Sequence, residues 1–382
     1  MPAFAGHDIE RMVVDSSIQR ITRLTPLSAI LALIDSRVGA VKPQKSALGA
    51  ARDFTLAEDV VSSEQPPRPI ALRDGFPVNA AAVADAGPYA PVALPPTVRR
   101  IDAGEPLPSD TDAVLPLDAV ALRGHRAEAL AAVTAGEGVL PKGGDATPRT
   151  PLRRAGQRAR AIDIAVMAAA EIKDVTIRAP RIHIVHGGET RSPAVDVALT
   201  TLIRVAGEAG AVVTGRSITL EPALGDEETS AVIAVGGTGS GLRDAAVHAL
   251  KRLGRVEAYG IAVSPGETAA FGFAAAKPVL LVPGRLDAAL AIWLLIGRYL
   301  VAKLAGGSIA DWPVTRPLKR KVTSTIGLTE LVPVSCAGGV AEPLASGYLS
   351  LESLARSDGW ILVPADSEGY AAGTPVAVRS WP

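Results

Sequence analysis

One stretch, residues 230–253, constrains the fold more than any other. It reads SAVIAVGGTGSGLRDAAVHALKRL: an apolar run, then a glycine-rich loop at residues 236–241, then apolar residues at helical spacing. The pattern predicts a buried strand, a loop and a helix in succession. Glycines let a backbone approach a ligand closely, and a helix N-terminus supplies free N–H groups and a partial positive charge. We therefore expect the loop to point N–H groups at an anion.

Asp244, in the expected first turn of that helix, leaves two interpretations open. A carboxylate there would repel a bare phosphate, and a Mg²⁺ ion that bridges carboxylate and phosphate would remove the conflict. Alternatively, the loop is a tight turn before an ordinary crossover, and Asp244 only stabilises the helix N-terminus. The glycine spacing matches neither the dinucleotide-binding fingerprint nor the Walker A loop.

The composition limits the classes of protein to consider. A chain of 382 residues predicts several domains, and 48% hydrophobic residues predict buried cores rather than disorder. Lys plus Arg and Asp plus Glu both number 39, so no global charge favours nucleic acid or an anionic membrane. The single cysteine, Cys336, excludes an internal disulfide and a multi-cysteine metal site. With neither a signal peptide nor a long apolar span in the sequence, we expect a soluble, cytoplasmic protein.

The order of these patterns predicts a multidomain chain of α/β and β parts. Short apolar runs between Gly, Pro and Asp at residues 90–150 predict a small β module. Residues 181–305 alternate strand and helix, which predicts a doubly wound parallel sheet with helices on both faces. Short runs and turns in the last segment predict a small C-terminal β-barrel or sandwich.

Several loops carry residues with possible chemistry. Asp74 and Asp145 each lie in a turn with glycine, and residues 186–190 follow a predicted strand, where ligands bind in α/β sheets. A solvated turn carboxylate is the ordinary alternative for both aspartates. The arginines at 149–160 form a basic cluster that fits phosphates, acidic partners or simply a solvated face. The histidines lack ligand spacing, so we expect no histidine-based zinc site.

Considered together and in order, short motifs along nearly the whole chain resemble those of one family. They are the segments 56–60 (LAEDV), 72–78, 104–108, 112–114, 143–145, 186–190, 235–244, 264–272 and 283–284, and turns of the tail at 324, 358–359, 368–369 and 376. Their order is similar to that of the MoeA family, the molybdopterin molybdotransferases of molybdenum cofactor synthesis, which includes the gephyrin E domain.

The resemblance implies an elongated homodimer of four-part chains with a cleft formed partly across subunits. The implied parts are a discontinuous helical domain of residues 17–45 and 151–180, a β module of 46–150, a molybdopterin-binding-like α/β domain of 181–310 and a β-barrel of 316–382. The implied reaction takes adenylated molybdopterin and molybdate with Mg²⁺, inserts molybdenum and releases AMP. A molybdoenzyme or another protein of the cofactor pathway is a possible partner, and nucleic acid and membrane are not.

The same resemblance implies the site residues. The implied catalytic residues are Asp74, Asp145, Glu189 and Asp244, with Glu189 and Asp244 as metal ligands. The implied binding positions are those of the loop residues Gly187, Gly188, Gly236, Gly237, Ser240, Gly241, Pro265, Gly266, Pro283 and Gly284.

Some positions depart from the family pattern and keep a second function open. Glu267 stands where the family has lysine, Gly188 where it has aspartate, and Arg285 where it has asparagine. These changes remove positive charge and polar contacts where a polyanionic substrate should lie, although Arg191 and Arg285 could compensate. The alternative is a non-catalytic pterin-binding or assembly protein. An unrelated nucleotide enzyme is a third interpretation, supported by the glycine-rich loop alone.

Overall fold

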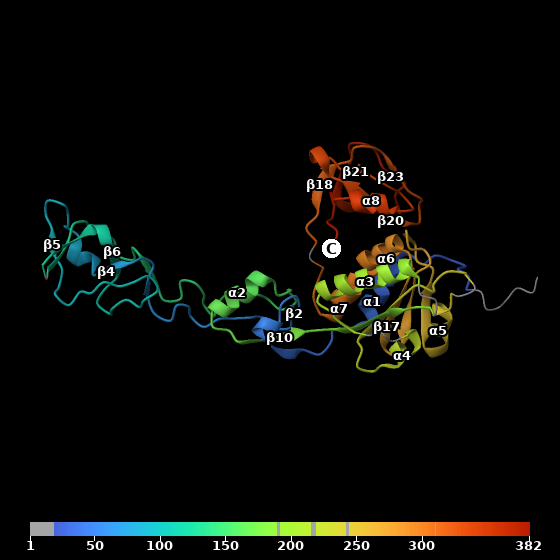
Figure 1. Ribbon diagram of the computed structural model, residues 1–382, viewed down its shortest axis with the longest axis horizontal. Coiled ribbons are helices and arrows are strands. Elements are labelled where there is room, and N and C mark those ends of the chain that lie inside the picture. Colours follow the sequence, from blue (N-terminus) through green and yellow to red (C-terminus); the bar gives the residue numbers. More distant parts are fainter. Residues whose placement is uncertain (1–18, 125, 189–191, 215–218, 242–243, 310) are drawn as a thin grey trace, which may run out of the picture. The chain divides into compact units, whose positions relative to one another are not determined.

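A computed structural model describes residues 19–124, 126–188, 192–214, 219–241, 244–309 and 311–382. The chain forms two compact units (Figure 1). The first, called the sheet unit below, comprises Met1–Gln44, Asp53–Thr55 and Arg178–Pro382. The second, called the module unit, comprises Lys45–Arg52 and Leu56–Ile177. Each unit therefore takes more than one segment of the sequence.

A six-stranded sheet lies at the centre of the sheet unit. Its strand order is β12-β11-β13-β17-β16-β14. The strands are β11 (Arg181–His186), β12 (Val212–Thr214), β13 (Ala231–Val235), β14 (Arg255–Tyr259), β16 (Ala270–Ala274) and β17 (Lys277–Val282). Every residue of β13 is buried, which confirms the strand predicted from its apolar run.

The sheet is parallel only in part. Strands β12, β11, β13 and β17 run parallel, but β16 pairs antiparallel with β17 and with β14. The prediction of an entirely parallel sheet was therefore wrong at this edge. Only residues 275 and 276 separate β16 from β17, and a parallel crossover needs a dozen residues or more.

Helices cover both faces of the sheet (Figure 1). One face contacts α1 (Leu27–Arg37), α3 (Pro193–Glu208), α6 (Leu286–Ile292), the π-helical turn η4 (Trp293–Gly297) and α7 (Arg298–Leu304). The other contacts α4 (Leu220–Gly225) and α5 (Ala246–Leu253). Side chains of β13 alternate between the two cores, as Ile233 and Val235 point to the first and Val232 and Ala234 to the second.

The C-terminal segment forms small sheets around a core of its own. Its elements are β18 (Val314–Pro317), β19 (Val322–Thr323), β20 (Thr329–Ser335), η5 (Ala337–Gly339), β21 (Glu342–Pro343), α8 (Leu351–Arg356), β22 (Gly359–Val363), β23 (Gly369–Tyr370) and β24 (Pro375–Val378). Strand β20 pairs with β21, β22 and β15 (Val263–Ser264), β18 pairs with β24, and β19 pairs with β23. The β character is as predicted, and closure into a barrel remains a prediction.

The module unit is built mainly from short strands. They are β1 (Gln44–Ala47), β2 (Thr55–Leu56), β3 (Ile70–Ala71), β4 (Gly75–Val78), β5 (Val92–Ala93), β6 (Ala113–Pro116), β7 (Val120–Arg123), β8 (Arg126–Ala129), β9 (Val139–Leu140) and β10 (Asp174–Arg178). They pair as β1-β10-β2, β3-β9, β4-β6 and β5-β8-β7. The short helices η1 (Leu48–Ala50), η2 (Ala80–Val83) and η3 (Leu117–Ala119) and the helix α2 (Ala161–Ala169) accompany them.

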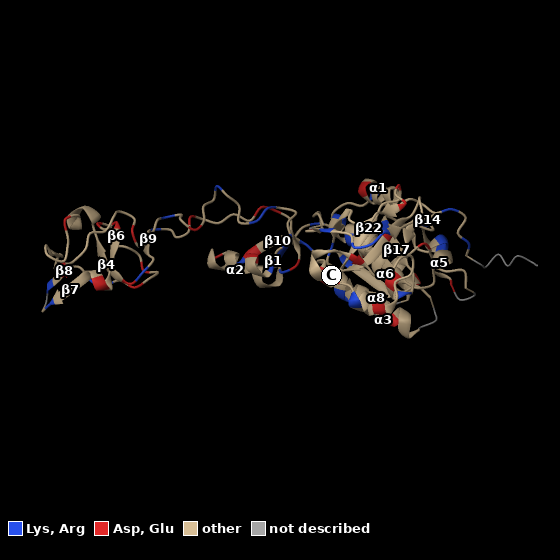
Figure 2. Ribbon diagram, turned by 90° about the horizontal axis from the view of Figure 1, so that it is seen from above, with Lys and Arg blue, Asp and Glu red and all other residues tan. Residues whose placement is uncertain are grey.

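Basic and acidic side chains are interspersed over the chain (Figure 2). Of the helices within the described ranges, none has the length and apolar character needed to cross a membrane.

Candidate functional site

Three loops converge at the carboxyl edge of the parallel strands. They follow β11, β13 and β17 and contain Gly187, Gly236 and Gly284. A Cβ atom on Gly187 would lie 2.1 Å from the carbonyl oxygen of Gly236, and one on Gly284 would lie 2.7 Å from Cγ2 of Val195 and 3.4 Å from Cα of Gly236. The loops therefore pack so closely that only glycine fits at these positions.

The carbonyl groups of the glycine-rich loop are held by other parts of the sheet unit. The carbonyl of Gly237 accepts from Ala246 N and from the Gln19 side chain, both at 3.0 Å. The carbonyl of Gly239 accepts from the same Gln19 Nε2 at 2.9 Å. The carbonyl of Thr238 accepts from the Tyr259 hydroxyl at 3.0 Å. Three consecutive carbonyls are therefore engaged.

The N–H groups of the same loop differ from its carbonyl groups in that most of them are not hydrogen-bonded within the described chain. For the N–H groups of Gly237, Thr238, Gly239 and Ser240, the part of the chain that the structure describes supplies no hydrogen-bond acceptor. Successive amides without partners, next to carbonyls that are held elsewhere, form the kind of concavity that binds anions. We call residues 237–240 the amide cradle.

The helix that follows the loop does not contribute to this cradle as predicted. Helix α5 begins at Ala246, several residues after Gly241. The N–H groups of Val247 and His248, near its N-terminus, donate to Oε1 of Gln19 at 2.8 and 3.3 Å. The prediction that the helix N-terminus faces an anion was therefore wrong, because a side chain from the start of the chain occupies those donors.

Asp244 lies before α5 and not in its first turn. Its Oδ2 accepts from the N–H of Gly241 at 2.8 Å, which closes the end of the glycine-rich loop. Burial, and to a lesser extent the Asp244 charge, raise the pKa of the nearby Tyr259. Asp244 therefore has a structural contact in addition to the metal-ligand role that the family resemblance implies.

The expected metal pair is only partly visible. Glu189 lies outside the described residues, whereas Gly187 and Gly188 lie at the end of β11. Among the described positions, no group of three or more His, Cys, Asp or Glu side chains is arranged to hold a metal ion.

The loop with Pro265 and Gly266 contacts the glycine-rich loop. The Thr268 hydroxyl lies 3.2 Å from the hydroxyl of the buried Thr238. Glu267, which stands where the family has lysine, turns its carboxylate back to accept from Gly266 N at 3.0 Å. Gly266 has φ +137°, and a Cβ atom there would lie 2.8 Å from Ile292. This loop thus brings a carboxylate, and not a cation, to the edge of the site.

The loop with Pro283 and Gly284 ends in a neutralised cation. Arg285 forms a bidentate pair with Asp287, with Nε to Oδ1 at 3.1 Å and Nη2 to Oδ2 at 2.5 Å. Its guanidinium also lies 4.8 Å from the centre of the Tyr348 ring. The hydrogen bonds that Arg285 donates to Asp287 raise the pKa of the guanidinium. Arg285 therefore compensates little for the missing lysine while this pair is intact.

His186, at the end of β11, opens the motif of residues 186–190. Its side chain is buried, and Nε2 lies 3.1 Å from Oδ1 of Asp196. Its Nδ1 has no hydrogen-bond partner among the described residues. The sequence signal was a histidine at the carboxyl end of a strand. By contrast, His183 in the same strand is a packed structural residue, held by Asp226 at 2.6 Å and Thr214 at 2.9 Å.

The two remaining acidic residues belong to the module unit. Asp74 is exposed, and its Oδ1 accepts from Ala103 N at 2.9 Å while Oδ2 lies 3.6 Å from Arg100. Asp145 is exposed, and its backbone N–H donates to the carbonyl of Gln65 at 2.9 Å. Asp244 belongs to the sheet unit, so the predicted carboxylates come from both units.

The predicted arginine cluster is partly structural. Arg160 forms a bidentate pair with the buried Asp163, the third residue of α2. Burial raises the pKa of Asp163, but the bonds from Arg160 and the charge of Arg153 outweigh it, so the pKa is lowered overall. At least these arginines stabilise the helix and do not form a free basic surface.

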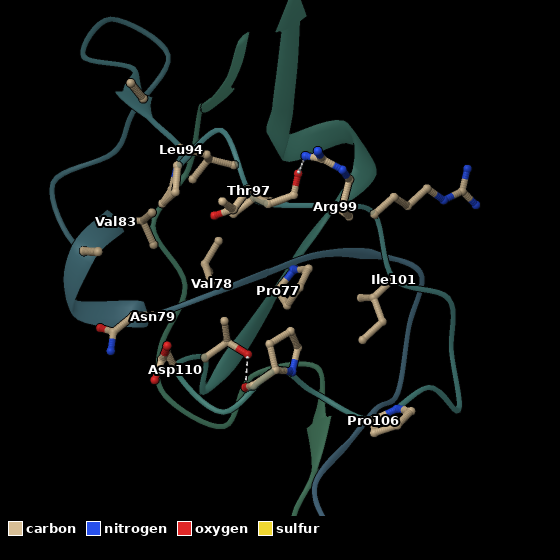
Figure 3. Close-up of a pocket in the computed structure, with 17 residues that line it drawn as sticks. Pro77, Val78, Asn79, Val83, Leu94, Thr97, Arg99, Ile101, Pro106 and Asp110 are labelled. Carbon is tan, nitrogen blue, oxygen red and sulfur yellow. Dashed lines mark hydrogen bonds between the residues drawn. The ribbon is translucent and has the colours of Figure 1, made fainter. Parts of the chain in front are cut away.

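The module unit also contains a pocket that the sequence did not suggest. Its volume is about 550 Å³, and apolar side chains and prolines line it, among them Pro77, Val78, Val83, Leu94, Ile101 and Pro106 (Figure 3). The guanidinium of Arg99 folds back onto the carbonyls of Pro96 and Val98 at 2.8 and 3.1 Å. Scattered apolar and proline residues carry no sequence signal for such a pocket.

Comparisons with solved structures agree on the fold. A crystal structure of the molybdopterin biosynthesis MoeA protein from Pyrococcus horikoshii superposes with a TM-score of 0.75 at 20% identity, covering 94% of this chain and all (100%) of that chain. A molybdenum cofactor biosynthesis protein from Pyrococcus furiosus gives a TM-score of 0.58 at 17% identity, with 94% and 100% covered.

Comparisons of sequence agree on the family. A molybdopterin biosynthesis protein of Methanocaldococcus jannaschii is 33% identical over 152 residues, which are 40% of this chain and only 36% of that protein. Residues 18–170 match the model of the MoeA N-terminal region (domain I and II), and residues 315–381 match that of the MoeA C-terminal region (domain IV). The two family models match in order along the sequence, one before and one after the strands of the six-stranded sheet. The chain therefore belongs to the MoeA family, whose proteins are linked to molybdenum cofactor biosynthesis.

Proposed function

We propose that this protein inserts molybdate into adenylated molybdopterin and releases AMP, as a molybdopterin molybdotransferase that works as a homodimer. The amide cradle is the observation that carries the proposal. Its N–H groups, which have no acceptor among the described residues, would bind an oxyanion of the substrate without any lysine, because backbone amides are fixed dipoles that need no counter-charge. The cradle lies at the carboxyl edge of parallel strands, which is where α/β sheets bind ligands.

The residues near the cradle fit a Mg²⁺ ion that is shared with the substrate. Mg²⁺ is usually held by one or two carboxylates together with substrate phosphates and water. Asp244 offers one such carboxylate, with Oδ2 turned to Gly241 N. When bound, the ion would offset the charge of phosphate and molybdate. Glu189 is the second proposed ligand, and Asp74 and Asp145 are the other proposed catalytic residues.

The proposal is tested by measuring AMP release from adenylated molybdopterin, with and without molybdate and Mg²⁺. We expect release only when both are present, at a rate proportional to protein concentration. An established MoeA protein treated in parallel shows that the substrate is intact. Absence of release under conditions in which that control turns over would contradict the proposed reaction.

Glu267 and the Arg285–Asp287 pair favour a second candidate, a non-catalytic pterin-binding or assembly protein. Both leave the site with less free positive charge than the family pattern has. This protein would bind molybdopterin species and a molybdoenzyme without releasing AMP. Binding measured by calorimetry, together with no turnover, would favour it over the molybdotransferase.

A further inference from the structure

We propose that Gln19 is a positioning residue that orients the amide cradle toward its anion. Gln19 lies far from the glycine-rich loop in sequence, yet its side chain contacts that loop and is only 3% exposed. Its side chain makes four hydrogen bonds, two as donor to the carbonyls of Gly237 and Gly239 and two as acceptor from α5. The inference rests on the proposed function, in which the cradle binds a substrate oxyanion.

The orientation follows from the geometry of the peptide bond. In a planar trans peptide, the C=O of one residue and the N–H of the next point in opposite directions. When Gln19 holds the Gly237 carbonyl, the N–H of Thr238 must point away from Gln19. The bond to the Gly239 carbonyl does the same for the N–H of Ser240.

Tyr259 completes the arrangement. Its hydroxyl donates to the Thr238 carbonyl at 3.0 Å, which turns the N–H of Gly239 away from the tyrosine. Without these restraints, glycines at 237 and 239 would let the peptides rotate and present carbonyl oxygens to the anion. Two side chains, one from the start of the chain and one from β14, therefore set the polarity of the cradle.

The chemistry of the side chain matters as well as its size. Only an amide can donate two hydrogen bonds from Nε2 and accept others on Oε1 in this way. The oxygen accepts from the N–H groups of Val247 and His248, so the N-terminus of α5 is capped by a side chain of the protein itself. These two N–H groups are then not available to the substrate, which would bind to the amide cradle. Leucine has a similar volume but makes none of these bonds, and glutamate keeps only the acceptor role.

Calorimetric titration of the full-length protein with inorganic pyrophosphate tests the inference. We expect Gln19→Leu to bind pyrophosphate at least about tenfold more weakly than the native protein, since hydrogen bonds to charged groups are the strong ones. Gln19→Glu should also lose binding, although it keeps the cap on α5, because an oxygen would face the carbonyls of Gly237 and Gly239. Tyr259→Phe should lose about threefold, since it frees one peptide only.

A control separates positioning from loss of stability. Val332→Ala truncates a buried residue of the C-terminal core and leaves the loop contacts untouched. It should lower the unfolding temperature but not the affinity for pyrophosphate. Folding of each variant is checked by circular dichroism, and Gln19→Glu serves where Gln19→Leu does not fold. Unchanged pyrophosphate affinity in a folded Gln19→Leu or Gln19→Glu variant would overturn the inference.

The inference and the proposed function can fail separately. If the native protein binds pyrophosphate and Gln19 variants do not, but no AMP is released, Gln19 positions the loop and the proposed reaction is wrong. If AMP is released and the Gln19 variants bind pyrophosphate normally, the reaction stands and the role of Gln19 is wrong. A native protein that does not bind pyrophosphate also overturns the role of Gln19, and AMP release then judges the reaction.

Discussion

Two loops at the carboxyl edge of the same sheet offer positive charge in different ways. The loop after β13 carries no cationic side chain among its residues 236–241, yet the amides of residues 237–240 have no acceptor among the described residues. The loop after β17 carries Arg285, yet the guanidinium is paired with Asp287. The ability of a site to bind an anion therefore depends on which hydrogen-bond donors remain unpaired, and not on how many cationic side chains the sequence supplies.

The largest effect is expected where a side chain would separate the closely packed loops. Gly187→Ala should abolish anion binding and lower the free energy of unfolding by about 2–4 kcal/mol, because its Cβ would lie 2.1 Å from a backbone oxygen. Gly207→Ala, in α3, has no atom within 4 Å of the added Cβ and is the matched control. Chemical denaturation and pyrophosphate titration measure both effects. An equal response of the two variants would argue against glycine being required at 187.

Asp244→Asn tests the carboxylate beside the cradle. We expect AMP release to fall about a hundredfold, since the variant removes a proposed Mg²⁺ ligand. The free energy of unfolding should change by less than about 1 kcal/mol, because an amide oxygen can still accept from Gly241 N. The matched control is Asp226→Asn, a carboxylate that pairs with His183 in the same unit. If Asp244→Asn retained native turnover, Asp244 would have only its structural contact.

Asp287→Asn tests whether the ion pair with Asp287 prevents Arg285 from binding an anion. Removing the carboxylate charge should free the guanidinium and strengthen pyrophosphate binding about three- to tenfold. The free energy of unfolding should fall by about 1–2 kcal/mol, because the buried Asp287 loses its charge-assisted hydrogen bonds with Arg285. The double variant Asp287→Asn with Arg285→Gln should not gain affinity. A gain that survives in the double variant would exclude Arg285 as its source.

The smallest effect is expected at the comparable pair in the module unit. Asp163 has a lowered pKa in the folded chain, so its contribution is present above its ordinary pKa of 3.8 and is lost as pH falls through the lowered value. Asp163→Asn should therefore cost most stability above about pH 5 and progressively less as the pH falls below 3.8. Thermal unfolding of both proteins from pH 2 to 7 measures this. A difference independent of pH would mean that the charge of Asp163 contributes nothing.

Much of the fold followed from local patterns. The buried strand β13, the alternation around it and the β character of the module and C-terminal segments could be predicted, because apolar periodicity records which faces are buried. The order of short motifs led to the MoeA family, which the family models confirm. The antiparallel edge was missed because strand patterns look alike in both directions, and only the two-residue link between β16 and β17 decides the pairing.

Some features of the candidate site could also be predicted from local sequence, whereas others depend on contacts between distant residues. The local pattern was enough to predict where glycines permit close approach and which loops lie at the carboxyl edge. Only the folded chain shows which backbone groups are used: Gln19, 218 residues from Gly237, takes two loop carbonyls and the N–H groups of Val247 and His248, and Asp287 pairs with Arg285. The physical reason is that a hydrogen-bond donor is available only if nothing else in the folded chain has reached it, and distant partners leave no mark in the local pattern.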